Sequence, residues 1–524
     1  MGWIDAITLN RELVRDAGQT DLAAIVSGSS IDSAFWAQSV DEMKRDILRD
    51  DGRVAIVSLA EEQPLGNFLG TVNAWTEIKR LIPAPSQGVS LWNMVFGKGK
   101  RLSPFTQALG NRKAAFPTPL RGSRSGKYLR TGDLATLYSN SWLRHLRDRG
   151  FHGALIKWGD EAIIPSSEWG AAGHDFSDVD LIRFVWKTEP TDVLAREKEW
   201  FVINDESGLI ERLIPRQTLD SLTAALRRFE HGRYSTAVNL GSIAVSYRFL
   251  RLAAQIFEEF PGGRFSADWD PFVMFLLLGS GDLPDSPAVQ TGLAQAEARC
   301  PGLTAKIKEL QSSIRHHLGR PLRVGFVDFG EAFWVDFGLH STLRQCLASL
   351  TSDGAAGETT RSFFSIPQQR DANGNILVRS MVPAEARITN SVIVDSTIAD
   401  RESVVHGGVV VGSRHNRLSM SAGGASLFSA VRDLQFEGEN GITFRSVAAA
   451  LRIPEGGRHT SLFLNETPIP LVSNESIRAY DDAEYGNPIL GNSLSFEAAG
   501  NRASEVPPRQ LEENWLAAWR DLKL

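Results

Sequence analysis

Glycines and basic residues gather between Val89 and Leu120, directly after an apolar run that predicts a buried strand. The run gives way to Gly97-Lys98-Gly99-Lys100-Arg101, and Lys113 follows further along the chain. Glycine lets backbone N–H groups approach phosphate oxygens, because no Cβ stands in the way, and fixed cations can neutralise a polyphosphate. We therefore expect a phosphate-binding loop with Arg101 and Lys113 as its cations. The alternative is a solvated turn with incidental basic residues.

Carboxylates that could hold a metal occur where strands are expected to end. Asp160 comes directly after the apolar segment 153–158 and Gly159, and Asp336 lies in Trp334-Val335-Asp336-Phe337-Gly338. Two carboxylates holding Mg²⁺, opposed by two cations, would suit attack of one phosphate on the α-phosphate of a nucleoside triphosphate. Such an attack needs no general base, since a sugar phosphate is already an anionic nucleophile. For each aspartate the alternative is a helix cap or a turn.

Strands and helices alternate through the first two thirds of the chain. Apolar strands at 22–26 and 53–59 alternate with helices over 32–48 and through Ile78, and a helix over 132–149 precedes the strand 153–158. This alternation predicts an α/β fold with a doubly wound, mostly parallel sheet. In such sheets ligands bind beyond the carboxyl ends of the strands, where the glycine-rich segments fall.

The pattern changes after residue 350. Residues 351–360 (TSDGAAGETT) have the composition of a linker, and from Ala386 the chain reads in sixes with an apolar first column: Ala386, Val392, Ile398, Val404 and Val410. An aliphatic hexad predicts a left-handed parallel β-helix, with ordinary antiparallel structure as the alternative. We expect a catalytic domain over 1–350, a linker over 351–361, a β-helix and β-rich domain over 362–509, and an amphipathic helix over 510–524.

Composition narrows the class of protein. The chain has 524 residues, 42% of them hydrophobic and 23% charged, which is typical of a globular protein of two or three domains. A net charge of −6 without a basic block gives no reason to expect nucleic acid as a partner. Two cysteines without metal-type spacing argue for a reducing compartment. No stretch is apolar enough to span a membrane, and we expect a cytoplasmic protein.

Taken in order, the loop with Arg101, Pro104, Thr106 and Lys113 resembles the signature loop of the sugar-1-phosphate nucleotidyltransferases (pyrophosphorylases), usually written GGxGxRLxPLT…K. The resemblance spans about residues 20–350. It implies a Rossmann-like nucleotidyltransferase sheet, and a β-helix is a frequent C-terminal companion in this family.

Further motifs match the family in the same order. Its Gly-Asp after a strand, whose Asp binds Mg²⁺, looks like Gly159-Asp160. Its sugar-contacting Asn-x-Gly is matched by Asn239-Leu240-Gly241, and its W-x-D-x-G, with the second metal Asp, by the segment that carries Asp336. The resemblance implies Arg101, Lys113 and Asp160 as catalytic residues, Asp160 and Asp336 as the metal ligands, and Asn239 and Gly241 as sugar-binding residues. The nucleotide-binding residues that it implies are Gly66, Gly70, Thr71, Gly97, Lys98, Gly99, Lys100, Arg101 and Gly159.

The order of segments is similar to one branch of the family. Gln63 and the segment Gly66–Thr71, expected to help hold the base, precede the glycine loop, as in the fucose-1-phosphate guanylyltransferases (GDP-fucose pyrophosphorylases). Other positions depart from the family: Phe96 replaces the first glycine of the usual pair. The usual Glu-Lys-Pro is absent, and Arg212 or Arg216 could stand in for its cation, or serve packing or the surface instead.

The expected function is condensation of a nucleoside triphosphate with a sugar-1-phosphate to an NDP-sugar, with release of pyrophosphate and with Mg²⁺ as cofactor. GTP and fucose-1-phosphate are the first guess for the substrates. The alternative is a non-catalytic nucleotide-sugar-binding regulator or scaffold. The β-helix and the C-terminal helix allow association into a homo-oligomer, and neither nucleic acid nor a membrane is expected as a partner.

Overall fold

The computed structural model describes residues 2–15, 20–48, 54–61, 65–83, 85–166, 175–229, 232–258, 265–277, 287–477 and 482–522. Gln63 and the start of the strand expected at Arg53 lie outside these residues. The chain forms two compact units. The first unit consists of residues 1–94, 136–158 and 163–333, and the second of 95–135, 159–162 and 334–524. The division does not follow the boundary predicted at residue 350, since the glycine loop belongs to the second unit.

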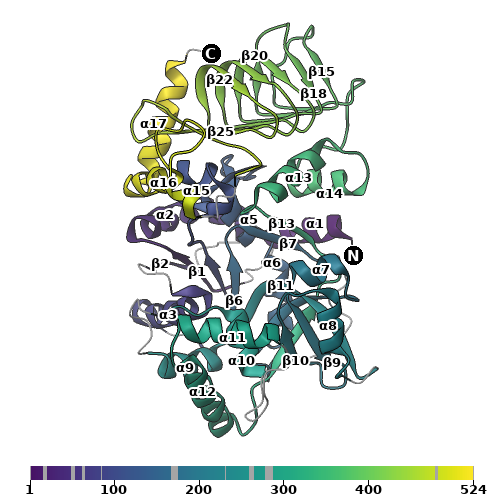
Figure 1. The fold of residues 1–524 in the computed structure, drawn as a ribbon, viewed down its shortest axis with the longest axis vertical. Coiled ribbons are helices and arrows are strands. Elements are labelled where there is room, and N and C mark those ends of the chain that lie inside the picture. The colour runs from purple at the N-terminus through teal and green to yellow at the C-terminus, as the bar shows by residue number, and fades with distance from the viewer. Residues whose placement is uncertain are drawn as a thin grey trace. The chain divides into compact units, whose positions relative to one another are not determined.

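A nine-stranded mixed sheet forms the centre of the first unit, in the order β2-β1-β3-β6-β11-β8-β12-β10-β9 (Figure 1). Its strands are β1 (Leu22–Ser27), β2 (Ala55–Ala60), β3 (Val89–Met94), β6 (Gly153–Trp158), β8 (Leu181–Lys187), β9 (Trp200–Asn204), β10 (Leu209–Ile214), β11 (Tyr234–Ser246) and β12 (Val324–Asp328). Parallel pairs join β2, β1, β3 and β6, as the alternation of strands and helices predicted.

The other half of the sheet corrects the prediction of a mostly parallel arrangement. Strand β11 pairs antiparallel with both β6 and β8, and β9 pairs antiparallel with β10. The β9–β10 connection is a short turn, which can join only antiparallel strands, because a parallel pair needs a long crossover. Asn204 Oδ1 accepts the backbone N–H groups of Glu206 and Ser207 at 3.0 and 3.2 Å and so closes this turn.

Helices of the first unit begin where polar residues cap their first turns. Ser29, Thr191, Thr218 and Ser246 each accept a backbone N–H three residues on. The helices are α1 (Trp3–Leu13), α2 (Ser30–Ile47), α3 (Gly66–Leu81), α6 (Asn140–Asp148), α7 (Asp192–Glu197), α8 (Leu219–Leu226), α9 (Tyr247–Ile256), α10 (Trp269–Leu277), α11 (Pro287–Arg299) and α12 (Leu303–Leu318).

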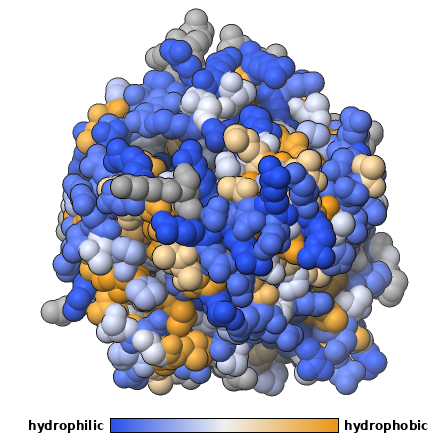
Figure 2. All heavy atoms as spheres, turned by 90° about the horizontal axis from the view of Figure 1, so that it is seen from above, coloured by the Kyte–Doolittle hydropathy of each residue, from blue (hydrophilic) through white to orange (hydrophobic). Residues whose placement is uncertain are grey.

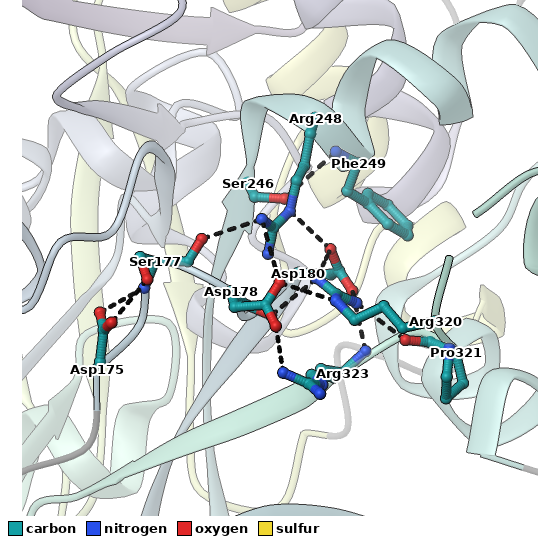
Figure 3. A network of polar contacts seen from close by, with 10 residues as sticks. All are labelled: Asp175, Ser177, Asp178, Asp180, Ser246, Arg248, Phe249, Arg320, Pro321 and Arg323. Atoms are coloured by element: carbon teal, nitrogen blue, oxygen red, sulfur yellow. Dashed lines mark hydrogen bonds and ion pairs between the residues drawn. The ribbon is translucent and has the colours of Figure 1, made fainter. Parts of the chain in front are cut away.

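An ion-pair network ties together the starts of three elements of the first unit (Figure 3). The carboxylate of Asp180, 1% exposed, accepts Arg248 Nε at 2.9 Å, Arg320 Nη1 at 2.7 Å and the backbone N–H of Arg323 at 2.9 Å. These residues stand at or just before β8, α9 and β12. Because a buried carboxylate with this many donors is well satisfied, the network holds the edges of these elements in register.

The second unit contains two sheets of parallel strands built from the C-terminal residues (Figure 1). One has the order β14-β16-β19-β21-β23-β25-β26 and the other β15-β18-β20-β22-β24, with β17 paired to β20. The last pair, β25 with β26, is antiparallel. The strands are β14 (Ile376–Val378), β15 (Arg387–Thr389), β16 (Val392–Val394), β17 (Thr397–Ile398), β18 (Val404–His406), β19 (Val409–Val411), β20 (Arg414–Met420), β21 (Ala425–Leu427), β22 (Ala430–Phe436), β23 (Ile442–Phe444), β24 (Val447–Ile453), β25 (Arg458–Leu462) and β26 (Ile469–Ser473).

The repeat of these strands is close to 17 residues and not a strict multiple of six. Val392 pairs with Val409, Val409 with Ala425, and Ala425 with Ile442. The shared hydrophobic core takes its side chains from both sheets at Ile388, Ile393, Ile398, Val405 and Val410. The expected first column is therefore only partly correct, since Ala386 and Val404 are half-buried. The inward positions are unevenly spaced, because the segments between successive turns differ in length.

Further elements lie wholly or partly in the second unit. They are η1 (Lys100–Leu102), α4 (Phe105–Ala108), η2 (Lys113–Ala115), β4 (Pro117–Arg121), β5 (Tyr128–Arg130), α5 (Thr131–Leu137), α13 (His340–Thr351), α14 (Ala355–Phe363), α15 (Asp482–Gly486), α16 (Phe496–Glu505) and α17 (Pro508–Asp521). Strands β7 (Glu161–Ile164) and β13 (Phe333–Asp336) form a separate pair.

Most of the segment 351–361, expected as a linker, is helical. Helix α14 begins at Ala355, and its Thr359, Thr360 and Phe363 are buried. Arg361 donates from Nη1 to the carbonyls of Leu350 and Ser352 at 3.0 and 2.7 Å. Small polar residues typical of a linker therefore pack tightly here, since tertiary contacts override their weak helix propensity.

The surface is largely hydrophilic on the face shown in Figure 2, and both cysteines are buried and free. On the face shown in Figure 2, hydrophilic residues predominate and hydrophobic ones are scattered among them. Cys300 and Cys346 are both free and buried. Among the described helices, none combines the length and the apolar character needed to cross a bilayer.

Candidate functional site

The glycine loop of the second unit has a backbone that only glycine adopts easily. Gly97 and Gly99 have φ angles of 104° and 61°. A Cβ on Gly99 would stand 2.7 Å from Thr106 Cγ2, so a larger residue would displace that threonine. The Thr106 hydroxyl donates to the carbonyl of Gly99 at 2.8 Å, and Gln107 Nε2 donates to that of Lys98 at 3.2 Å. The residues after the loop therefore fix its shape.

Lys113 crosses this loop and reaches a carboxylate. Its Cε lies 3.5 Å from where a Cβ on Gly97 would stand, and its Nζ donates to Asp160 Oδ1 at 2.8 Å. The Asp160 side chain is 4% exposed and that of Lys113 is 21% exposed. A carboxylate this buried requires a cation partner, and Lys113 supplies it. The structure thus brings together two of the residues predicted to be catalytic.

Asp336 lies beside Asp160. A Cβ on Gly338 would stand 2.6 Å from Asp160 Oδ2 and 2.9 Å from Asp336 Oδ1, so both carboxylates converge on this glycine. The Gly338 N–H donates to Asp336 Oδ1 at 2.7 Å, and the Phe337 N–H donates to the Asp160 carbonyl at 2.9 Å. The two short segments that carry the carboxylates are therefore bonded to each other through their backbones.

Burial and the charges around Asp336 shift the pKa of its carboxyl in opposite directions. Burial, followed by repulsion from Asp160, raises the pKa of the Asp336 carboxyl above its ordinary value. The Gly338 N–H and the charges of Arg101 and Lys113 pull that pKa down. Arg101, exposed on the glycine loop, thus acts electrostatically on the same site. A second cation beside the two carboxylates would relieve their repulsion.

The donor set suits a hard cation held partly by its substrate. Mg²⁺ is usually bound by one or two carboxylates together with phosphate oxygens and water, and Asp160 and Asp336 match that requirement. Among the residues that the structure describes, no group of three or more His, Cys, Asp or Glu side chains could hold a metal. The two carboxylates therefore fit a metal that comes with phosphate ligands better than one bound by protein alone.

Two lysines of the loop, both predicted to bind the nucleotide, contact other side chains of the chain. Lys98 Nζ lies 3.7 Å from Glu497 Oε1, and Lys100 Nζ lies 4.6 Å from the centre of the Tyr485 ring. Both partners belong to the C-terminal segments of the second unit. Gly159 lies in the turn that precedes Asp160, as expected. Arg101, in the same loop, differs from these lysines in that its charge lowers the pKa of Asp336.

Gly66, Gly70 and Thr71 lie in the first unit, inside helix α3, and serve packing. A Cβ on Gly66 would stand 2.6 Å from the Ala267 carbonyl oxygen, and one on Gly70 2.3 Å from Glu61 Oε2. Thr71 is completely buried, and its hydroxyl donates to the Asn67 carbonyl at 2.7 Å. These residues were expected to contact a nucleotide, but in the structure their surroundings are filled by the chain itself.

Asn239 is held in a buried polar cluster of the first unit. Its Oδ1 accepts Arg183 Nη2 at 2.8 Å and the Gly241 N–H at 2.9 Å, and its Nδ2 donates to Asp270 Oδ1 at 3.2 Å. Arg183 Nη2 also donates to Asp270 Oδ1 at 2.6 Å. Asn239 is 2% exposed, whereas the Asp270 side chain is 36% exposed. A ligand reaching this cluster would therefore meet Asp270 before Asn239.

Sequence reasoning missed Arg183 and Asp270. Arg183 is completely buried, and its Nε and Nη1 have no hydrogen-bond partner in the described part of the chain. A charged residue in the middle of the apolar strand 181–186 was the available signal, because such a residue is rarely buried without a polar partner. Gly241, with φ of 88°, lies where the β11–β8 register shifts, which is why the motif ends in glycine.

The two arginines considered as a substitute cation have other partners. Arg212 Nη1 donates to the carbonyls of Leu277 and Glu211. Arg216 Nε lies 2.7 Å from Glu199 Oε1, with its side chain 60% exposed. In this structure Arg212 serves packing and Arg216 a surface ion pair.

Comparison of the chain with known protein families and with curated proteins found no match.

Proposed function

We propose that this protein is a nucleotidyltransferase that condenses a nucleoside triphosphate with a sugar-1-phosphate to an NDP-sugar and releases pyrophosphate. The observation that carries the proposal is the Lys113–Asp160 pair, which lies against Asp336 beside the Gly97–Arg101 loop of the second unit. Cations and carboxylates that converge beside a glycine loop are the groups that phosphoryl chemistry requires.

The reaction needs charge stabilisation more than proton transfer. A phosphate oxygen of the sugar-1-phosphate forms a bond to the α-phosphorus of the triphosphate, and the bond from that phosphorus to the bridging oxygen of pyrophosphate breaks. Negative charge develops on the α-phosphate and on the departing pyrophosphate. Arg101 and Lys113 would bind and neutralise these oxygens, and Gly97 and Gly99 would let the loop backbone approach them.

We propose Mg²⁺ as the cofactor, with Asp160 and Asp336 as its protein ligands. The ion would supply Lewis-acid stabilisation of the phosphate oxygens when it is bound. Asp160 can serve both roles, because Oδ1 faces Lys113 and Oδ2 faces Gly338 and Asp336. The pKa of Asp336 is raised, so a cation bound beside this carboxyl would stabilise its ionised form.

We also propose a fold family for each of the two units. We interpret the first unit as a Rossmann-like nucleotidyltransferase sheet, supported by the parallel order β2-β1-β3-β6. We interpret the C-terminal parallel sheets as a left-handed β-helix, supported by their shared core and short repeat. Asn239 and Gly241 remain the proposed sugar-binding motif, with the more exposed Asp270 as its contact group. Fucose-1-phosphate and GTP are the substrates to test first, and we propose a cytoplasmic location.

The alternative is a regulatory or scaffold protein that binds a nucleotide sugar without turnover. The placement of Lys98 and Lys100 favours it, because both contact C-terminal segments and so leave fewer cations for a triphosphate. The burial of Thr71 points the same way, since it removes one expected nucleotide contact.

Pyrophosphate release separates the two proposals. The purified chain with Mg²⁺ is offered each of four nucleoside triphosphates with fucose-1-phosphate and other sugar-1-phosphates, and pyrophosphate is measured. Asp160→Asn should lower turnover by about a hundredfold or more, because it removes a group that stabilises the developing charge. Turnover by Asp160→Asn near that of the unmodified chain would disprove the metal assignment, and binding without any turnover would favour the scaffold.

The control is a second Lys–Asp pair of the same length. Lys187 Nζ donates to Asp205 Oδ1 at 2.8 Å in the first unit. Asp205→Asn removes the same kind of carboxylate from outside the proposed site, so it should leave turnover unchanged. A similar loss in both variants would indicate general damage and not a catalytic role for Asp160.

A further inference from the structure

A pocket of about 220 Å³ opens in the second unit at the start of helix α13. Its lining includes His340 and Arg344 from that helix, Arg458 from β25, and Glu475. None of these residues belongs to the group around Asp160. Two guanidinium groups and one carboxylate give the pocket an excess of positive charge.

The two arginines differ in how well they are neutralised. Arg344 Nη1 pairs with Glu475 Oε1. Arg458 Nη1 donates to the Asn474 carbonyl at 2.8 Å, and within the described ranges this arginine has no carboxylate partner. Burial, followed by the charge of Arg344, lowers the pKa of Arg458 to about 10. A cation under this repulsion would be stabilised by an anion in the pocket.

His340 adds an unsatisfied acceptor. The residue is 9% exposed, and its Nε2 lies 2.6 Å from the Ser103 carbonyl oxygen, so Nε2 carries the proton and donates. Burial lowers the pKa of His340 to about 3, which keeps the ring neutral. Its Nδ1 is therefore an acceptor, and it has no hydrogen-bond partner in the part of the chain that the structure describes. A ligand that donates an O–H would satisfy it.

The helix contributes as well. Helix α13 has 12 residues and begins at His340, and Leu339 provides no side-chain cap. The N–H groups of a first turn without a side-chain cap, together with the helix dipole, favour a negative charge at this end.

We propose that this pocket binds a monohydrogen phosphate group, either free phosphate or a phosphate monoester of a small metabolite. The anionic oxygens would face Arg458, Arg344 and the start of α13, and a P–OH or a neighbouring hydroxyl would donate to His340 Nδ1. The combination selects an anion that also carries a proton, because the pocket offers donors from the arginines and an acceptor from the histidine.

The site has a direct connection to the proposed active site. His340 holds the carbonyl of Ser103, two residues after Arg101, and α13 begins four residues after Asp336. A ligand bound to His340 therefore contacts the residue that anchors both segments. Phosphate at this pocket would bias the positions of Arg101 and Asp336 as far as its affinity differs between their arrangements.

The test is calorimetric titration of the full chain with inorganic phosphate and, separately, with sulfate. Phosphate should bind measurably, and Arg458→Gln should weaken it by about tenfold or more, as loss of a charge-assisted hydrogen bond does. Arg344→Gln, on a half-exposed side chain, provides a second variant should the first fail to fold. Sulfate has no proton at neutral pH and should bind more weakly. Equal binding of sulfate would overturn the role given to His340.

Two further variants locate the binding. Arg452 also pairs with a glutamate of the second unit, at 3.4 Å from Glu437, but it lies outside the pocket, so Arg452→Gln should not change phosphate affinity. Lys113→Met should leave phosphate binding at the pocket intact. Absence of phosphate binding to the unmodified chain, or its loss in Lys113→Met but not in Arg458→Gln, would overturn the proposal. Neither result depends on whether the chain transfers nucleotides.

Discussion

The pair Lys113–Asp160 allows a quantitative test of the candidate site, because the chain holds a matched pair elsewhere. Both Lys113–Asp160 and Lys187–Asp205 have an N···O distance of 2.8 Å. They differ in burial: the aspartates are 4% and 39% exposed, and the lysines 21% and 32%. Equal geometry with unequal burial isolates the effect of the surroundings on the strength of the interaction.

A double-mutant cycle measures each coupling energy. Exposed pairs couple by about 0.2–1 kcal/mol, and we expect this for Lys187 and Asp205. Removing one partner of a fully buried pair costs about 3–5 kcal/mol, because a charge is left uncompensated. Lys113 is partly exposed and Arg101 also acts on the site, so we expect a smaller coupling of about 1–3 kcal/mol for Lys113 and Asp160.

The assay is urea unfolding of Lys113→Met, Asp160→Asn and the double variant, with the corresponding three variants at Lys187 and Asp205. A chain of two units need not unfold in one step, so the cycle is applied to the transition that each set of variants moves. The deficit of Lys113→Met should grow as pH rises above about 4, since the pKa of Asp336 is already raised and would rise further without this cation. Equal coupling energies for the two pairs would refute our account of the site.

Three further changes test other features of the structure. Gly338→Ala places a Cβ within 3 Å of the two carboxylates that flank it, so it should abolish turnover and destabilise the second unit by about 1–3 kcal/mol. Gly292→Ala is the control, because its Cβ meets only an ordinary contact. It should be neutral or stabilising in the same melts. Burial raises the pKa of Glu61 to about 7, although a hydrogen bond from the Leu65 N–H lowers it, so ionisation of Glu61 costs stability as pH rises from about 4.5 to 7. Glu61→Gln should remove that loss, which amounts to up to about 3 kcal/mol. The same dependence of stability on pH in the variant and the unmodified chain would contradict this. Burial opposes ionisation of Asp395, but hydrogen bonds from Arg379, Arg121 and Tyr128 hold its pKa below the usual range. Asp395→Asn should therefore lower the free energy of unfolding by about 1–2 kcal/mol at pH 7 and by progressively less as pH falls below about 4. Measuring stability at a series of acidic pH values would show this.

Local patterns in the sequence were sufficient for many elements. Apolar runs that alternate with helical segments predicted the parallel strands β1, β2, β3 and β6. Glycines at 97 and 99 were correctly assigned to a loop, because their left-handed φ angles exclude most other residues. These features depend on neighbours within a few residues, which the sequence displays directly.

Features that depend on distant segments were not predictable in the same way. Small polar residues at 355–363 form a helix because Arg361 bonds to carbonyls at 350 and 352. The antiparallel insertion of β11 between β6 and β8 follows from pairing across the sheet and not from the local pattern of β11. The repeat near 17 residues follows from how the strands of two sheets close around one core. Each is decided by which partners the folded chain brings together.

The candidate site shows the same difference between what local sequence predicts and what distant segments decide. By itself the sequence determined which residues could do phosphate chemistry, since Arg101, Lys113, Asp160 and Asp336 carry the required charges next to glycines. Only the tertiary structure decided that these four act on one another, because they come from three separate segments of the chain. It also decided that Thr71 is buried instead of exposed to a ligand, because a side chain's accessibility depends on everything packed around it.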